Sequence, residues 1–152
     1  MTEEQLQAEC VTWLRRAYPS VLTVPGKTST WSPQHTEKIK MQGYSNKNAD
    51  LFILHNDGVF GMLCIEFKKP GKVLYNRDGS PRAENNGHFK EQLRVHEYYR
   101  KQKYRVEIVQ SLTHFQRICN EHLRDVSRNH DPYLDDFTPD MIPECNIDKF
   151  LS

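Results

Sequence analysis

The chain has 152 residues, of which 37% are hydrophobic and 27% are charged, and its formal net charge is +1. This length and composition are typical of one compact globular domain. No apolar run approaches the roughly 20 residues that span a bilayer, which argues against a membrane protein. The acidic N-terminus MTEEQLQAEC does not match a secretory signal, and four scattered cysteines form neither a disulfide framework nor a zinc knuckle. We therefore expect an intracellular protein, cytoplasmic or nuclear and not secreted, with reduced thiols.

The charge is distributed unevenly along the chain. Residues 68–82 contain five Lys or Arg against one Asp, and residues 88–105 contain six against two. Residues 131–152 contain six acidic residues and only Lys149, a net charge of −5. A basic middle region can neutralise phosphates, although a solvated surface would look the same. We predict a domain over residues 1–130 and an acidic C-terminal tail, 131–152, that packs on it or extends from it.

The first half of the chain contains signals for one helix and three strands. Thr2 and Gln5 form a capping-box pattern, and apolar residues recur at helical spacing until Pro19. Val21 to Val24 could form a short strand, and residues 25–47 read as a loop. Two apolar runs, 51–54 and 59–67, flank His55-Asn56-Asp57-Gly58, which is a hairpin signal. Their nearly continuous apolar character predicts a hairpin covered on both faces.

The second half begins with a basic, Gly- and Pro-containing stretch, 70–87, in which Asp78-Gly79 could turn a small hairpin. A helix over 88–103, a strand over 106–110 and a helix over 112–126 follow. The predicted order is α, β, β, β, α, β, α. Gly26-Lys27-Thr28 resembles the end of a phosphate-binding loop, but Val21 stands where that loop needs glycine, so no nucleotide cofactor is expected. Cys119 and His122 lie on an apolar helix face, which favours core packing over zinc binding.

Chemistry-bearing residues converge on Glu66-Phe67-Lys68. Side chains two apart on a strand share a face, and charges on a buried strand are costly unless they pair with each other or with a metal. Asp50 precedes the partner strand. A two-residue turn at 57–58 would make paired residue numbers sum to 115 and point Asp50 away from Glu66, whereas a sum of 116 would make the two face each other. We therefore predict a three-residue loop or a one-residue bulge.

Two further polar residues and a basic region are candidates for the same site. Glu3 lies in line with the apolar stripe of the first helix, where it either completes the acidic set or only favours the helix dipole. Gln92 lies on the helix that follows the basic loop. The cations and aromatics around it have the composition that binds phosphates and stacks on bases. The nucleic-acid-binding candidates are Lys69, Lys72, Arg77, Lys90, Arg94, Tyr99, Arg100 and Lys101.

These residues, in this order and spacing, resemble the VRR-NUC family of the PD-(D/E)xK, or restriction-endonuclease-like, nuclease superfamily. The resemblance runs from the first helix to about Leu123 and rests on Glu3 and Gln7 in TEEQLQ, Gly43 and Asp50 in MQGYSNKNADLFIL, Glu66 and Lys68 in IEFKKPG, and Gln92 in HFKEQLRVHEYY. Ala49 stands where the family usually has proline. The segment between Lys68 and Gln92 is longer than in many members.

The resemblance implies an α/β fold with a central mixed sheet flanked by helices in the order αβββαβ plus a C-terminal helix. It also implies one or two Mg²⁺ or Mn²⁺ ions held by Asp50, Glu66, the backbone carbonyl of Phe67 and, through water, Glu3. The metal would polarise a phosphodiester oxygen and lower the pKa of a bound water. Lys68 would orient or deprotonate that water or stabilise the developing charge. Gln92 would place Lys68 or the water.

The leading hypothesis is a metal-dependent endonuclease acting on structured DNA, a four-way junction or a flap, in replication, recombination or repair. A two-fold homodimer would supply the two sites that junction cleavage needs. One alternative is a sequence-specific restriction or homing endonuclease on the same scaffold. Another is a non-catalytic nucleic-acid-binding module in which the acidic residues are structural.

Overall fold

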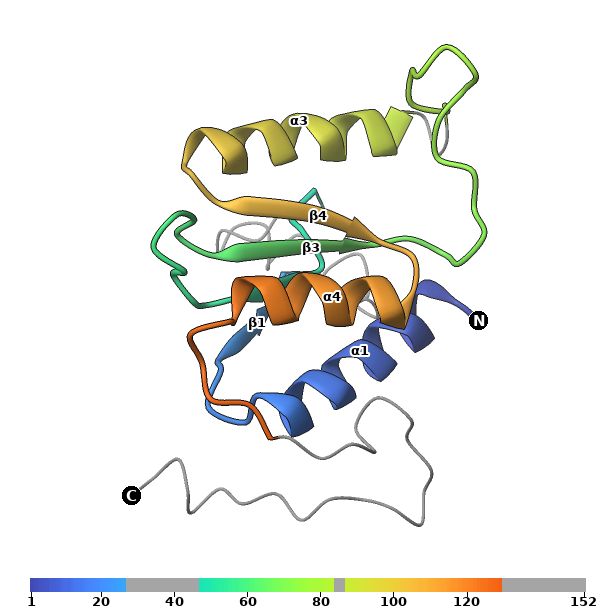
Figure 1. The fold of residues 1–152 in the computed structure, drawn as a ribbon. Helices are drawn as coiled ribbons and strands as arrows, with labels where there is room; N and C mark the ends of the chain where they lie inside the picture. Colours follow the sequence, from blue (N-terminus) through green and yellow to red (C-terminus); the bar gives the residue numbers. More distant parts are fainter. Residues whose placement is uncertain (27–46, 84–86, 130–152) are drawn as a thin grey trace, which may run out of the picture.

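The computed structural model describes residues 1–26, 47–83 and 87–129. Their order of elements matches the order predicted from the sequence and confirms the α/β class (Figure 1). Residues 27–46 of the loop predicted over 25–47, and the acidic tail predicted over 131–152, lie outside the described residues. The elements are α1 (Glu3–Ala17), β1 (Thr23–Pro25), β2 (Leu51–Ile53), β3 (Leu63–Phe67), α3 (His88–Lys101), β4 (Arg105–Val109) and α4 (Leu112–His122).

Helix α1 begins at the capping box predicted from the sequence. The Thr2 hydroxyl accepts a hydrogen bond from the Gln5 backbone N–H at 3.1 Å, and the Gln5 side chain accepts one from the Thr2 backbone N–H at 2.8 Å. Two of the otherwise unpaired N–H groups at this end are thereby satisfied. The helix ends at Ala17, ahead of Pro19. Its apolar stripe is buried and consists of Leu6, Cys10, Trp13, Leu14 and Ala17.

The four strands form one mixed sheet in the order β1-β2-β3-β4, in which only the β3–β4 pair is parallel. Helices α1 and α4 lie on one face and α3 lies on the other (Figure 1). All five residues of β3 are buried, as a strand covered on both faces requires. The predicted covering of this strand is therefore confirmed. Cys10, Cys64 and Cys119 are buried free thiols.

The pairing of β2 with β3 has the predicted register but not the predicted turn. Leu51 pairs with Ile65 and Ile53 with Leu63, so paired residue numbers sum to 116. However, residues 54–62 connect the strands, so the expected three-residue loop or one-residue bulge is wrong. The Asp57 carboxylate accepts hydrogen bonds from the backbone N–H groups of Val59 and Phe60 at 2.8 and 2.7 Å. These local bonds fold the backbone into a turn and leave it unavailable for strand pairing.

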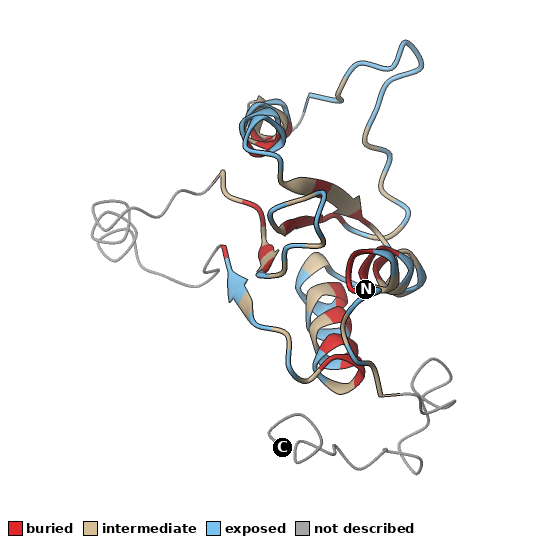
Figure 2. Cartoon of the chain, turned by 60° about the vertical axis from the view of Figure 1, so that its left-hand side comes forward, coloured by how far each residue is buried: buried red, intermediate tan, exposed pale blue. Residues whose placement is uncertain are grey.

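The loop between β3 and α3 projects from the body and is mostly exposed (Figure 2). Its tip is the small hairpin predicted at Asp78-Gly79, with a bridge between Tyr75 and Pro81 and Gly79 at a φ of +85°. Its base is fixed by Gln110, whose amide donates to the carbonyls of Lys69 and Lys72 at 3.1 and 2.8 Å. The loop is thus anchored next to the C-terminal end of β3. No helix among the described residues is long and apolar enough to cross a membrane.

Candidate active site

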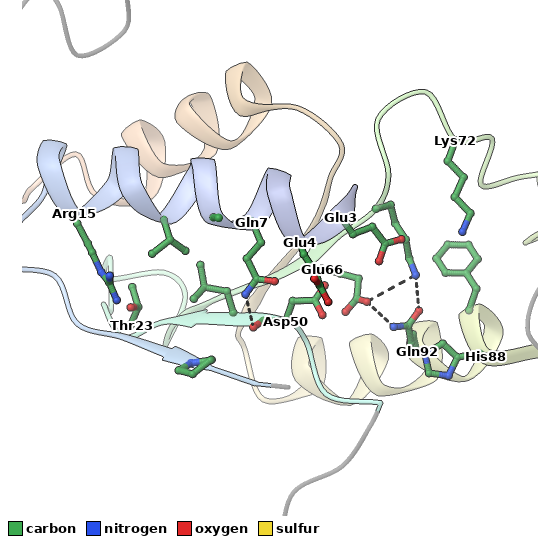
Figure 3. A pocket seen from close by; sticks show the side chains of 16 residues that line it. Glu3, Glu4, Gln7, Arg15, Thr23, Asp50, Glu66, Lys72, His88 and Gln92 are labelled. Carbon is green, nitrogen blue, oxygen red and sulfur yellow. Dashed lines mark hydrogen bonds and ion pairs between the residues drawn. The ribbon is translucent and has the colours of Figure 1, made fainter. Parts of the chain in front are cut away.

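The site begins where β3 meets the N-terminal half of α3. Glu66 lies on the face of β3 that α3 covers, and Lys68 follows two residues later. Gln92 joins them: its Nε2 donates to Glu66 Oε1 at 2.5 Å, and its Oε1 accepts from Lys68 Nζ at 2.8 Å (Figure 3). A carboxylate can only accept and an ammonium can only donate, so the two contacts allow a single orientation of the amide. The three side chains form one fixed unit.

Burial makes this unit dependent on its internal bonds. Glu66 is 1% exposed, Gln92 1% and Lys68 7%. Lys68 Nζ lies 3.8 Å from Glu66 Oε1 and 5.1 Å from the centroid of the Phe89 ring, so a carboxylate and an aromatic face lie beside the ammonium in addition to the Gln92 amide. Buried charges of opposite sign are tolerated when each has a partner.

Asp50 is held at the same end of the sheet by its backbone. Its N–H donates to the carbonyl of Ile65 at 2.9 Å, and its carboxylate Oδ2 accepts from the Phe67 N–H at 2.7 Å. Glycine at position 26 lets the backbone at residue 26 approach the backbone just before Asp50, because a Cβ there would lie 1.8 Å from the carbonyl oxygen of Ala49. Asp50 and Glu66 line the same cleft, so the predicted placement of both carboxylates on one side is confirmed.

The cleft has a volume of about 630 Å³ and lies between α1, the strand ends and the start of α3. Glu3 lines it, as predicted, and so does Glu4, the next residue of the helix. Gln7 also contributes: its amide donates to the Asp50 carbonyl at 3.3 Å, which ties α1 to the strand that carries Asp50 (Figure 3).

The donor atoms at this end suit a hard cation. Carboxylate and carbonyl oxygens are the ligands that Mg²⁺ and Mn²⁺ prefer, and Asp50, Glu66 and the Phe67 carbonyl could supply them. Within residues 1–26, 47–83 and 87–129, no three His, Cys, Asp or Glu side chains lie close enough together to hold an ion. Asp50 and Glu66, which line one cleft, and the Phe67 carbonyl are the oxygen donors at this end that would hold a cation, with water oxygens as further ligands.

His96 is a site neighbour to which the sequence prediction gave no role in the reaction. It is completely buried, with its Nε2 3.7 Å from Glu66 Oε2 and its ring stacked on Tyr99 at 6.3 Å between centroids. Its sequence signal was its spacing: residue i+4 from Gln92 occupies the same face of α3 one turn later.

The predicted nucleic-acid-binding residues are divided by the structure. Lys72 lines the cleft, whereas Lys69 and Arg77 are exposed on the projecting loop. Four exposed cations of α3 do not line the cleft: Lys90, Arg94, Arg100 and Lys101.

Tyr99 was predicted to stack on a base, and that prediction is wrong. Tyr99 is 7% exposed, and its hydroxyl accepts a hydrogen bond from the Ala49 N–H at 3.2 Å. The ring belongs to the core on the α3 side of the sheet, whereas the adjacent Tyr98 is 60% exposed. Consecutive helix residues point about 100° apart, so the two tyrosines could not share one environment.

Comparison with solved structures finds the same arrangement of elements in a chain described as a "VRR_NUC domain protein". The two superpose with a TM-score of 0.56 over 84% of this chain and 92% of the other, at 19% sequence identity. The chain has the VRR-NUC fold. The resemblance predicted from Glu3, Asp50, Glu66, Lys68 and Gln92 is thereby confirmed at the level of the fold, which is restriction-endonuclease-like. No family model matches the sequence, and no curated protein matches it.

Proposed function

We propose that the protein is a divalent-metal-dependent nuclease that hydrolyses phosphodiester bonds in DNA. The observation that carries the proposal is the buried unit of Glu66, Gln92 and Lys68 opening into a cleft that Asp50 also lines. A purely structural ion pair would not need to open into a cleft with further carboxylates at its rim. The VRR_NUC description of the fold neighbour agrees with this assignment.

The residues divide the work of hydrolysis by charge. A hard cation bound by Asp50, Glu66 and the Phe67 carbonyl would supply Lewis-acid activation of the phosphate and a more acidic water. Lys68 presents a fixed ammonium beside that position, suited to orienting a water or to neutralising charge that develops on the phosphate oxygens. Gln92 holds the ammonium by its carbonyl oxygen and holds Glu66 by its amide nitrogen. Both groups are therefore preorganised before DNA binds.

We propose structured DNA, a four-way junction or a flap, as the substrate. The projecting loop brings Lys72 to the cleft and carries Arg77 further out, so cations lie both at the reaction centre and beyond it. Such a loop could contact a second DNA segment while the first occupies the cleft. Junction cleavage also requires two sites, for which we propose a homodimer, and sedimentation of the protein with and without junction DNA would measure that state.

The proposal is tested by incubating wild type, Glu66→Ala and Lys68→Ala with single-stranded, duplex, flap and four-way DNA. Each reaction is run in Mg²⁺, in Mn²⁺ and with a chelator. Gln102→Ala is the control, because Gln102 is exposed on the far end of α3. We expect cleavage of branched DNA by wild type and by the control, and its loss in both site variants and in chelator.

Each alternative has its own result. Cleavage by the two site variants at the wild-type rate would refute the assigned residues. Preference for one duplex sequence would instead select a restriction or homing endonuclease. DNA binding without cleavage in either metal would select a non-catalytic binding module.

A further inference from the structure

The cleft continues well beyond the acidic end at which the reaction is proposed. Along α1 it is lined by Glu4, Gln7, Ala8, Val11 and Arg15. Glu4, Ala8, Val11 and Arg15 follow one another at intervals of four, three and four residues, and Gln7 is adjacent to Ala8, so they form a single stripe on the helix. The cleft is therefore a groove that runs along most of the length of α1 and not only a pocket around Glu66.

The groove changes character from one end to the other. Carboxylates gather where α1 begins, Ala8 and Val11 make its middle largely apolar, and Arg15 lies at the far end beside Thr23 of the edge strand β1 (Figure 3). Arg15 is exposed, and it forms no ion pair or hydrogen bond with any side chain in the described part of the chain. A guanidinium in a groove, with a hydroxyl next to it, is a donor set for a phosphate.

We infer that Arg15 and Thr23 form a phosphate subsite, which binds a phosphodiester of the strand being cut at some distance from the scissile bond. The inference rests on the proposed nuclease function and names where its substrate strand lies. The occupant is one DNA strand, because its phosphates can bind at both ends of the groove. The Arg15 end attracts a phosphate directly, and the acidic end accepts one once a cation is bound there.

The geometry of α1 limits the position of this phosphate. Arg15 follows Glu4 by eleven residues, which corresponds to about 16 Å along a helix that rises 1.5 Å per residue. A DNA strand advances about 3.4 Å per nucleotide in the B form. The contacted phosphate should therefore lie within about five nucleotides of the cut, and nearer in nucleotide count if the strand is stretched.

Arg15 has a second effect that the experiment must separate from phosphate binding. It lies in the last turn of α1, where a positive charge also stabilises the helix end. Arg15→Gln removes the charge, Arg15→Lys keeps it, and Arg117→Gln is the matched control. Arg117 is an exposed arginine on α4 that does not line the groove. Thermal unfolding of each variant reports any loss of helix stability independently of DNA.

Binding to a fluorescently labelled flap DNA is measured with Mg²⁺ present and with the Lys68→Ala change in every variant, so that the acidic residues remain and cleavage does not interfere, at 50 to 200 mM salt. We expect Arg15→Gln to reduce the slope of log affinity against log salt by about 1, with Arg15→Lys and Arg117→Gln close to wild type. The same measurement is then repeated with a single uncharged methylphosphonate at each linkage in turn. At one linkage within about five nucleotides of the cut, Arg15→Gln should cause no loss of affinity beyond the loss that the methylphosphonate itself causes.

The results separate the two proposals. Three results would overturn the subsite. They are an unchanged salt slope in Arg15→Gln, affinity losses from Arg15→Gln and from the methylphosphonate that add at every linkage, and no DNA binding by the protein with Arg15 intact. If the subsite behaves as expected but wild type never cleaves, the nuclease proposal fails and the subsite stands. If Glu66-dependent cleavage is found while Arg15→Gln does not change DNA binding, the subsite fails and the nuclease proposal stands.

Discussion

Replacing Gln92 with leucine tests whether this amide holds the buried charges of Glu66 and Lys68. Leucine has a similar size and is apolar, so it removes both hydrogen bonds without opening a large cavity. Glu66 loses a donor at 2.5 Å and Lys68 loses an acceptor at 2.8 Å, in a region where none of the three residues is more than 7% exposed. Water has little access to replace either bond.

Hydrogen bonds to charged groups contribute about 1.5–3 kcal/mol each, so two lost bonds would cost about 3–6 kcal/mol if nothing moved. Lys68 Nζ and Glu66 Oε1 are already 3.8 Å apart and can move into direct contact, which recovers part of that loss. We therefore expect Gln92→Leu to lower the free energy of unfolding by about 2–4 kcal/mol. Cleavage should fall as well, because the ammonium would shift toward Glu66.

Urea unfolding measures the effect, with Gln102→Leu as the control because its side chain is exposed on the same helix. The Lys68→Met variant and the Gln92→Leu/Lys68→Met double variant complete a cycle that isolates the coupling between the two residues. A stability loss below about 0.5 kcal/mol in Gln92→Leu, or additive losses in the cycle, would refute the argument that the amide links the charges.

Three further predictions concern buried positions outside the unit of Glu66, Gln92 and Lys68. Gly26→Ala should destabilise by about 1–3 kcal/mol and reduce cleavage, because its Cβ would meet the Ala49 carbonyl at 1.8 Å; full activity with unchanged urea midpoint would contradict this. Tyr99→Phe should cost about 1–3 kcal/mol by calorimetry, since the Ala49 N–H loses its buried acceptor. Burial lowers the pKa of His122 below 6.5. The folded state therefore binds fewer protons than the unfolded chain, and stability should fall as pH drops below about 6.5, with a smaller fall in His122→Gln.

Local patterns in the sequence determined the elements and their order. The capping box at Thr2 fixed the start of α1, since its hydrogen bonds lie within one turn of the chain. The apolar run that became β3 predicted a strand buried on both faces. The parity rule for Asp50 and Glu66 also held, because side chains alternate along any strand and only an odd number of connecting residues between the two strands places Asp50 opposite Glu66.

The placement of individual side chains required the tertiary structure. The Asp57 carboxylate diverted the backbone at 54–62 from strand pairing, although the sequence there resembles a tight hairpin turn. Tyr99 looked like one of several surface aromatics until the packing of α3 on the sheet buried it.

The site itself shows the same division. Glu66, Lys68 and Gln92 could be chosen from sequence as chemistry-bearing residues. Their hydrogen bonds join positions 24 and 26 residues apart and exist only because α3 packs over the end of β3. Arg15 carried no sequence signal beyond its favourable charge at a helix end. Its place in the groove follows from the packing of α1 along the strand ends, since periodicity specifies which face of a helix is apolar but not what lies opposite the rest of it.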